Sequence, residues 1–134
     1  MKKVRFEILT KPHGKKRHRS TNRGISYNPK ENIVFENLVR LAYVNVSDEY
    51  FTGPVKLWLH FYFSVPSGYT KKQRELIATG VMKYTKKPDL DNCVKAVKDG
   101  LNIVAWKDDS QVIQTYARKS YGDRDSIIVT IIGD

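Results

Sequence analysis

A chain of 134 residues is long enough to bury one hydrophobic core and too short for two ordinary domains, so we expect a single domain over residues 1–134. With 24 Lys and Arg against 14 Asp and Glu, the formal charge of +10 favours a polyanionic partner, nucleic acid first and an anionic membrane surface second. It contains no apolar run long enough to span a membrane, no signal peptide and a single cysteine, which excludes an internal disulfide, so we expect a soluble cytoplasmic protein.

The first thirty residues predict a strand followed by a long basic loop. Val4, Phe6 and Ile8 alternate with charged residues, which is typical of a strand with one buried face. Residues 11–30 then contain seven Lys or Arg, no acid and no apolar period, but several Gly, Pro, Ser and Asn. This segment is therefore predicted to be an exposed loop.

The middle of the chain predicts a helix and a central strand. A helix is expected from about Pro29 to Tyr43, and its apolar spacing indicates a buried face made of Ile33, Val34, Leu38, Leu41 and Ala42. Residues 55–65 place alternate apolar side chains on one face, which predicts a strand at the centre of a sheet. The opposite face of this strand carries Trp58, His60 and Tyr62 and should be covered by a helix or by a second subunit.

The last half predicts two further helices and two strands. A short basic helix begins at Thr70 and ends at Gly80, and a longer one runs from about residue 90 to Leu101. Residues 111–122 and 125–134 are predicted to be strands joined as a hairpin. The fold class is α+β: one domain with a mixed β-sheet packed against two or three helices.

Acidic residues gather in one region of this basic chain. Five of the 14 acids lie between residues 86 and 109, namely Asp89, Asp91, Asp99, Asp108 and Asp109. In an extended segment, residues two apart point to the same side, so Asp89 and Asp91 can present paired carboxylates. If a helix starts near Asp91, then Lys95 and Asp99 continue a polar stripe that can share a cleft with Asp108 and Asp109.

Clustered carboxylates repel one another unless they hold cations, and Mg²⁺ prefers oxygen ligands. One or two such ions can polarise a phosphate and activate water, Lys95 can stabilise charge in the transition state, and Mn²⁺ accepts the same ligands. Taken singly, these residues also fit a helix cap, a surface ion pair and a turn. Together, in a basic chain, they favour a magnesium-dependent enzyme that cleaves phosphodiesters.

The sequence KPDLDNCVKAVKDGLN, followed by WKDDSQV, resembles the RusA-type Holliday junction resolvases. Its residues match, in order, the signature D-x-D-N-x-x-K-x-x-x-D-x-L and a later D-D-x-Q. The resemblance implies a homodimeric, Mg²⁺-dependent endodeoxyribonuclease that resolves four-way DNA junctions by paired symmetric nicks. It further implies a role in recombination, repair or phage DNA processing, with no membrane partner and no small-molecule cofactor.

Carried over by position, the resemblance implies metal-binding and catalytic carboxylates at Asp89, Asp91 and Asp109, and a catalytic lysine at Lys95. Asp108 resembles a supporting acid, and either Asp108 or Asp109 can be the direct ligand. Asn92 and Asp99 also match the motif and are expected to orient a ligand or cap the helix.

Basic residues on both sides of the acidic motif are candidates for contact with the DNA backbone. The expected contacts are Lys11, Lys15, Lys16, Arg17, Arg19 and Arg23 in the loop, and Lys86 and Lys87 before the motif. The alternative is a solvated charged face. Trp106 can stack on a base, but packing in the core or at an interface is the favoured interpretation.

Two other functions remain open from the residues alone. A DNA-binding module without catalysis would use the acids only for helix caps and charge balance. A nuclease of related chemistry could instead act on flap or hybrid substrates. Magnesium binding separates the first from a resolvase, and competition among substrates separates the second.

Overall fold

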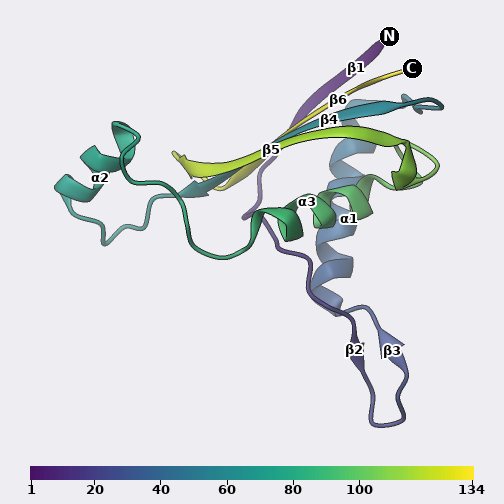
Figure 1. Cartoon of the computed structure of the whole chain (residues 1–134), viewed down its shortest axis with the longest axis horizontal. Coiled ribbons are helices and arrows are strands. Elements are labelled where there is room, and N and C mark those ends of the chain that lie inside the picture. The colour runs from purple at the N-terminus through teal and green to yellow at the C-terminus, as the bar shows by residue number, and fades with distance from the viewer.

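A four-stranded mixed sheet with two helices on one face forms the body of the protein (Figure 1). The computed structural model describes all 134 residues. The elements are β1 (Lys2–Ile8), β2 (Arg19–Ser20), β3 (Ser26–Tyr27), α1 (Lys30–Val46), β4 (Val55–Ser64), α2 (Lys71–Ala78), α3 (Leu90–Leu101), the 3₁₀ turn η1 (Asp109–Gln111), β5 (Val112–Gly122) and β6 (Ser126–Gly133). The α+β class and the mixed sheet are therefore confirmed.

The strand predicted to be central lies inside the sheet. The strand order is β1-β6-β4-β5, so β4 pairs antiparallel with β6 and parallel with β5. Alternate side chains of β4, including Leu57, Leu59 and Phe61, are buried against the helices. The alternate apolar side chains of β4 thus form the part of the core that the sheet contributes.

The predicted hairpin of β5 and β6 is wrong, because β4 lies between them. Residues 123–125 carry the chain from β5 past the end of β4 into β6. There the backbone N–H of Ser64, the last residue of β4, donates a hydrogen bond to the Asp125 carboxylate at 2.8 Å. The turn residues indicate a reversal of the chain, but a turn signal does not say which strands pair.

Helix α1 forms as predicted but buries a different face. Its buried residues are Asn32, Phe35, Val39 and Tyr43, whereas Ile33, Val34, Leu38 and Leu41 are exposed and Ala42 is partly buried. The helix is apolar on both sides, so spacing alone did not decide between them. The buried side carries the two aromatic residues, which remove more surface from water, and Tyr43 packs edge-on against Phe6 of β1 with ring centroids 5.8 Å apart.

Helix α3 packs closely on α1 through the face that its apolar period predicts. Cys93, Ala96, Val97 and Leu101 are buried. At Gly100 a Cβ atom would lie 2.7 Å from the Cβ of Val39, so the two helices approach too closely there for any larger residue. Burial raises the pKa of the Cys93 thiol to about 11, which fits a packing residue rather than a nucleophile.

The sheet face opposite the helices is uncovered. Trp58, His60 and Tyr62 line it, with Arg5 and Arg118 among the residues around a cavity of about 400 Å³. His60 stacks on Tyr62 and lies 2.6 Å from the Ser120 hydroxyl; burial lowers the pKa of His60 to about 4, so the ring is neutral at pH 7. The sequence predicted that a helix or a second subunit covers this face, and no helix lies on it. The structure also contains no helix long and apolar enough to cross a membrane.

Two extensions project from this body (Figure 1). One is the β2–β3 ribbon, whose residues 16–27 are all exposed. The other is the segment around α2, a helix with no buried residue, which starts with a capping box between Thr70 and Gln73. Since neither extension has a core of its own, both are available for contact with another molecule.

Candidate active site

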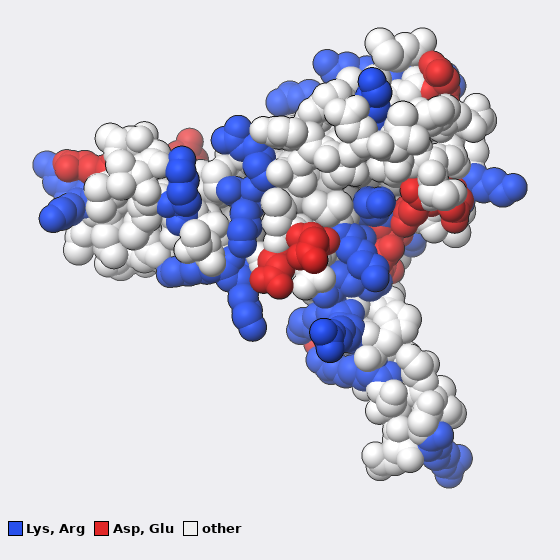
Figure 2. Space-filling view, viewed as in Figure 1, with Lys and Arg blue, Asp and Glu red and all other residues white.

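The two carboxylates of the DLD motif lie at the N-terminal end of α3. Asp89 is the N-cap residue, yet its side chain makes no capping hydrogen bond, and Asp91 lies in the first turn. Both side chains are exposed, and neither takes part in an ion pair or a hydrogen bond within the chain. Both residues lie at the positive end of the helix dipole, where an anionic group is stabilised. Figure 2 shows a red patch near this end of α3 with blue on both sides.

A cleft of about 560 Å³ is lined by the acidic motif and by the basic loop, which also contact each other. No hydrophobic side chain lines it. Its walls include Lys11, His13 and Lys16 from the loop, and Lys87, Asp89 and Asn92 from the motif. Positive charge on one wall and a free carboxylate on the other suit a nucleic-acid backbone. The cations attract its phosphates, and a phosphate then lies close to the carboxylate.

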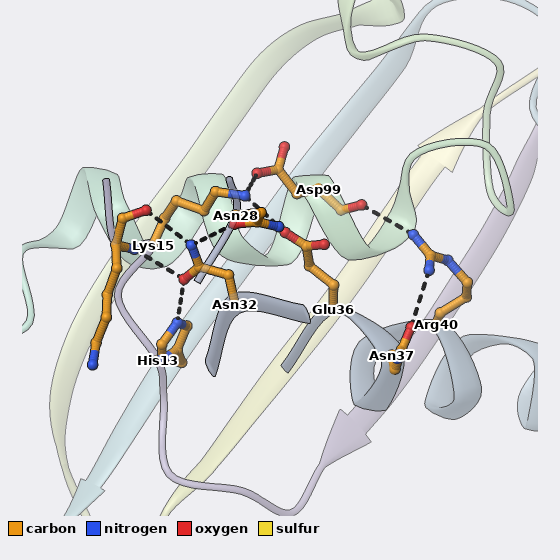
Figure 3. Close-up of polar contacts among 9 residues, drawn as sticks. His13, Lys15, Asn28, Asn32, Glu36, Asn37, Arg40 and Asp99 are labelled. Carbon is orange, nitrogen blue, oxygen red and sulfur yellow. Dashed lines mark hydrogen bonds and ion pairs between the residues drawn. The ribbon is translucent and has the colours of Figure 1, made fainter. Parts of the chain in front are cut away.

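The loop that forms this wall is fixed to α1 by a buried asparagine (Figure 3). Asn32 Oδ1 accepts hydrogen bonds from the Lys16 backbone N–H at 3.0 Å and from His13 Nε2 at 2.8 Å. Its Nδ2 donates to the Lys16 carbonyl and to Asn28 Oδ1, both at 2.8 Å. Every hydrogen-bonding position of this amide is therefore used, and residues 13–16 have a defined conformation.

Lys15, predicted to contact DNA, lines the same cleft and is bound by two acids. Its ammonium is 2.7 Å from Glu36 of α1 and 2.8 Å from Asp99 of α3, and its side chain is only 12% exposed (Figure 3). Burial acts to lower the pKa of Lys15, but the hydrogen bonds to Asp99 and Glu36 outweigh it and raise that pKa. Lys15 thus joins the loop to both helices, and its two acidic partners use two of the three donors of its ammonium.

The second acidic pair belongs to the turn before β5. The Asp108 carboxylate accepts a hydrogen bond from the Ser110 N–H at 2.9 Å, and hydrogen bonding to Ser110 lowers the pKa of Asp108. Asp109 Oδ1 accepts from Trp106 Nε1 at 2.9 Å. Trp106 is fully buried, so its predicted packing role is confirmed and its indole holds the Asp109 carboxylate in one orientation.

One chain does not bring the acids together. No group of three or more His, Cys, Asp or Glu side chains is close enough to hold a metal ion. Asp91 and Asp109 lie at opposite ends of α3, whose 12 residues span about 18 Å. The turn before β5 lies beyond the C-terminal end of this helix in Figure 1. Within one chain, Asp89 and Asp91 are thus a pair and Asp109 is apart.

Comparison with known proteins agrees with the motif. The family model described as "Endodeoxyribonuclease RusA" matches residues 10–132. The chain belongs to the RusA endodeoxyribonuclease family. RusA proteins are endonucleases of Holliday junctions, so the resemblance seen in the sequence is confirmed at the level of the family. The chain is also 32% identical to the "Uncharacterized protein YqaN" of Bacillus subtilis (strain 168), with 96% of this chain and 94% of that protein covered.

The remaining RusA motif residues have distinct positions. Lys95 is exposed one turn after Asp91, and its ammonium has no partner in the chain. The Asn92 carbonyl accepts the Lys15 N–H at 2.9 Å, and Asp99 pairs with the Lys15 ammonium. The Asn92 backbone and the Asp99 side chain therefore attach the basic loop to α3 in this structure. The predicted roles of Asn92 and Asp99 in orienting a ligand or capping the helix stay predictions.

The basic residues predicted to contact DNA differ in whether they are exposed or already bound to other groups of the chain. Lys11 and Lys16 face the cleft, and Arg17, Arg19 and Arg23 are exposed on the β2–β3 ribbon. Lys87 lines the cleft, while the Lys86 ammonium donates to the Tyr69 hydroxyl at 2.8 Å. Sequence reasoning did not identify His13 or Asn32 as contributors to the site. Asn32 lies on the same face of α1 as Phe35 and Val39. That face was predicted to be exposed, where a polar residue attracts no notice.

Proposed function

We propose that this RusA protein is a Mg²⁺-dependent, homodimeric endodeoxyribonuclease that resolves four-way DNA junctions by paired symmetric nicks. The observation that carries the proposal is the free carboxylate of Asp89 in a cleft whose other wall is basic, with the free carboxylate of Asp91 two residues further on in the first turn of α3. A module that only binds DNA gains nothing from unpaired acids beside a phosphate path, because they repel phosphate.

The acidic pair suits a magnesium ion. Mg²⁺ binds through one or two carboxylates and takes waters and substrate phosphates as its other ligands. Asp89 and Asp91 supply such a pair, and neither carboxylate is committed to another group. A bound ion would polarise the scissile phosphate and lower the pKa of a water. Lys95, one helical turn beyond Asp91, would stabilise negative charge that develops on the phosphate, and Mn²⁺ fits the same ligands.

Asp109 requires a second copy to join this pair. Since it lies about one helix length from Asp91, a dimer is needed to place the Asp109 of one subunit beside the acidic pair of the other. The Trp106 indole orients the Asp109 carboxylate through one oxygen and leaves the other free for such a role. Asp108 likewise has one carboxylate oxygen engaged, by the Ser110 N–H, so either Asp108 or Asp109 can be the direct ligand.

The substrate is tested with labelled DNA. The purified protein is incubated with a mobile four-way junction, a flap, an RNA–DNA hybrid and linear duplex, in competition and with Mg²⁺. A resolvase produces symmetric nicks near the crossover of the junction in preference to the other substrates. Preferred cleavage of the flap or the hybrid would move the function to the related nuclease. Tight junction binding without cleavage would indicate a binding module.

The β2–β3 ribbon is expected to bind phosphates of the junction. Replacing Arg17, Arg19 and Arg23 together by Ala should weaken junction binding and flatten the plot of log affinity against log salt, by about 0.9 for each phosphate that the variant no longer neutralises. Binding is measured without metal over a series of salt concentrations. The matched control replaces Lys3, Arg5 and Lys56, which lowers the net charge equally on the uncovered sheet face. If both variants remain dimeric, equal weakening would show a general charge effect and refute a role of the ribbon.

A further inference from the structure

The short segment that leads into Asp89 has no regular secondary structure, yet its backbone is held by a lysine from β5. Lys119 Nζ donates a hydrogen bond to the Lys86 carbonyl at 2.7 Å and to the Pro88 carbonyl at 2.9 Å. Lys119 belongs to the sheet face that the helices cover, in register with the buried Phe61 of β4. A rigid element of the fold thus binds the residues on both sides of Lys87.

A tyrosine binds the carbonyl between these two. The Tyr84 hydroxyl donates to the Lys87 carbonyl at 2.8 Å. The Tyr84 ring stacks on the buried Phe63 at a centroid distance of 4.0 Å, and the Lys119 ammonium lies 5.3 Å from its centroid. Three consecutive carbonyls before Asp89 are therefore fixed by two side chains that also contact each other.

The basic loop also packs against this segment. A Cβ atom on Gly14 would lie 2.6 Å from the Cβ of Pro88, so the loop backbone rests directly on the proline ring. Asp89 itself makes no capping bond to its own helix. The direction of its carboxylate consequently depends on the backbone that enters α3, and both Lys119 and Gly14 contact that segment.

We propose that Lys119 is a positioning residue, which fixes residues 86–88 so that the Asp89 carboxylate stands in a set orientation beside Asp91. Two of the three ammonium donors of Lys119 are used by carbonyls, which distinguishes it from the free lysines of the cleft. The catalytic part of this inference rests on the proposed nuclease function. The structural part, that Lys119 holds the segment, stands without it.

The test compares Lys119→Met, which keeps the length of the side chain but removes its donors, with Lys119→Arg, which keeps the charge and the donors. Lys56→Met, on the uncovered face of the sheet, is the matched control, once it is shown to be dimeric to the same extent as the wild type. Hydrogen exchange of the peptide spanning residues 84–92 is measured in metal-free protein. Single-turnover nicking of a junction is measured against Mg²⁺ concentration, and junction binding against salt.

For Lys119→Met we expect exchange in residues 84–92 to be at least about tenfold faster and nicking about tenfold slower, with a higher Mg²⁺ concentration at half-maximal rate. Junction affinity and its salt slope should be unchanged, and Lys119→Arg should recover part of the rate. Unchanged exchange overturns the positioning role, and faster exchange with an unchanged nicking rate overturns its catalytic part. A flatter salt slope identifies Lys119 as a phosphate contact instead. If the wild type nicks no substrate, the proposed function fails, while the exchange data still decide whether Lys119 holds the segment.

Discussion

An Asp91→Asn variant is expected to nick four-way junctions about a thousandfold more slowly than the wild type, while it binds them equally well or more tightly. Loss of one carboxylate from a two-carboxylate magnesium site removes several kcal/mol of charge stabilisation in the transition state, and about 4 kcal/mol corresponds to this factor. Asn keeps the shape of the side chain but removes a negative charge that repels the phosphate. The rate is measured in a single turnover, and binding is measured in the absence of metal.

The control for this variant is Asp48→Asn, an exposed acid in the loop after α1 and away from the cleft. It should nick at the wild-type rate. Calorimetric titration with Mg²⁺ should show binding to the wild type and to Asp48→Asn, and weaker or no binding to Asp91→Asn. A parallel loss of binding and nicking in Asp91→Asn would contradict a catalytic role and indicate that Asp91 supports the structure or the DNA contact.

Local pattern predicted the elements of this fold better than their partners. The period of α3 was sufficient to place Asp89 and Asp91 at the start of a helix whose other face is buried, because a helix face depends only on sequence spacing. The pairing of β5 with β4 was not predictable in the same way. It depends on a crossing of three residues past the end of β4, and no local signal distinguishes that crossing from a hairpin turn.

Contacts between side chains that are far apart in the sequence could not be predicted either. Lys15 appears in the sequence as one of several loop cations, and nothing local indicates that Glu36 and Asp99 bind it. Nothing in the sequence distinguishes Lys119 from other strand residues, because its contacts form only when the fold brings β5 next to residues 86–88. The motif predicted which acids matter, whereas the distance between Asp91 and Asp109 required the structure.

Because Asp91 and Asp109 of one chain lie apart, we expect nicking activity to recover when Asp91→Asn and Asp109→Asn are mixed. Asp91→Asn and Asp109→Asn should each be nearly inactive alone. In the proposed dimer, a site takes Asp91 from one subunit and Asp109 from the other, so a mixed dimer contains one intact site. After exchange of equal amounts, half of the dimers are mixed and each has one intact site of two, so activity should recover to roughly a quarter of the wild-type level.

The products of this mixture carry further information. Because a mixed dimer has a single working site, it should nick one strand of the junction and leave the symmetric strand intact. The matched control mixes Asp89→Asn with Asp91→Asn, which should remain inactive since both residues belong to the same pair and neither site of the mixed dimer is then complete. If Asp91→Asn and Asp109→Asn fail to complement each other although subunit exchange is demonstrated, Asp109 does not act across the dimer. Its bond to Trp106 would then serve only the turn before β5.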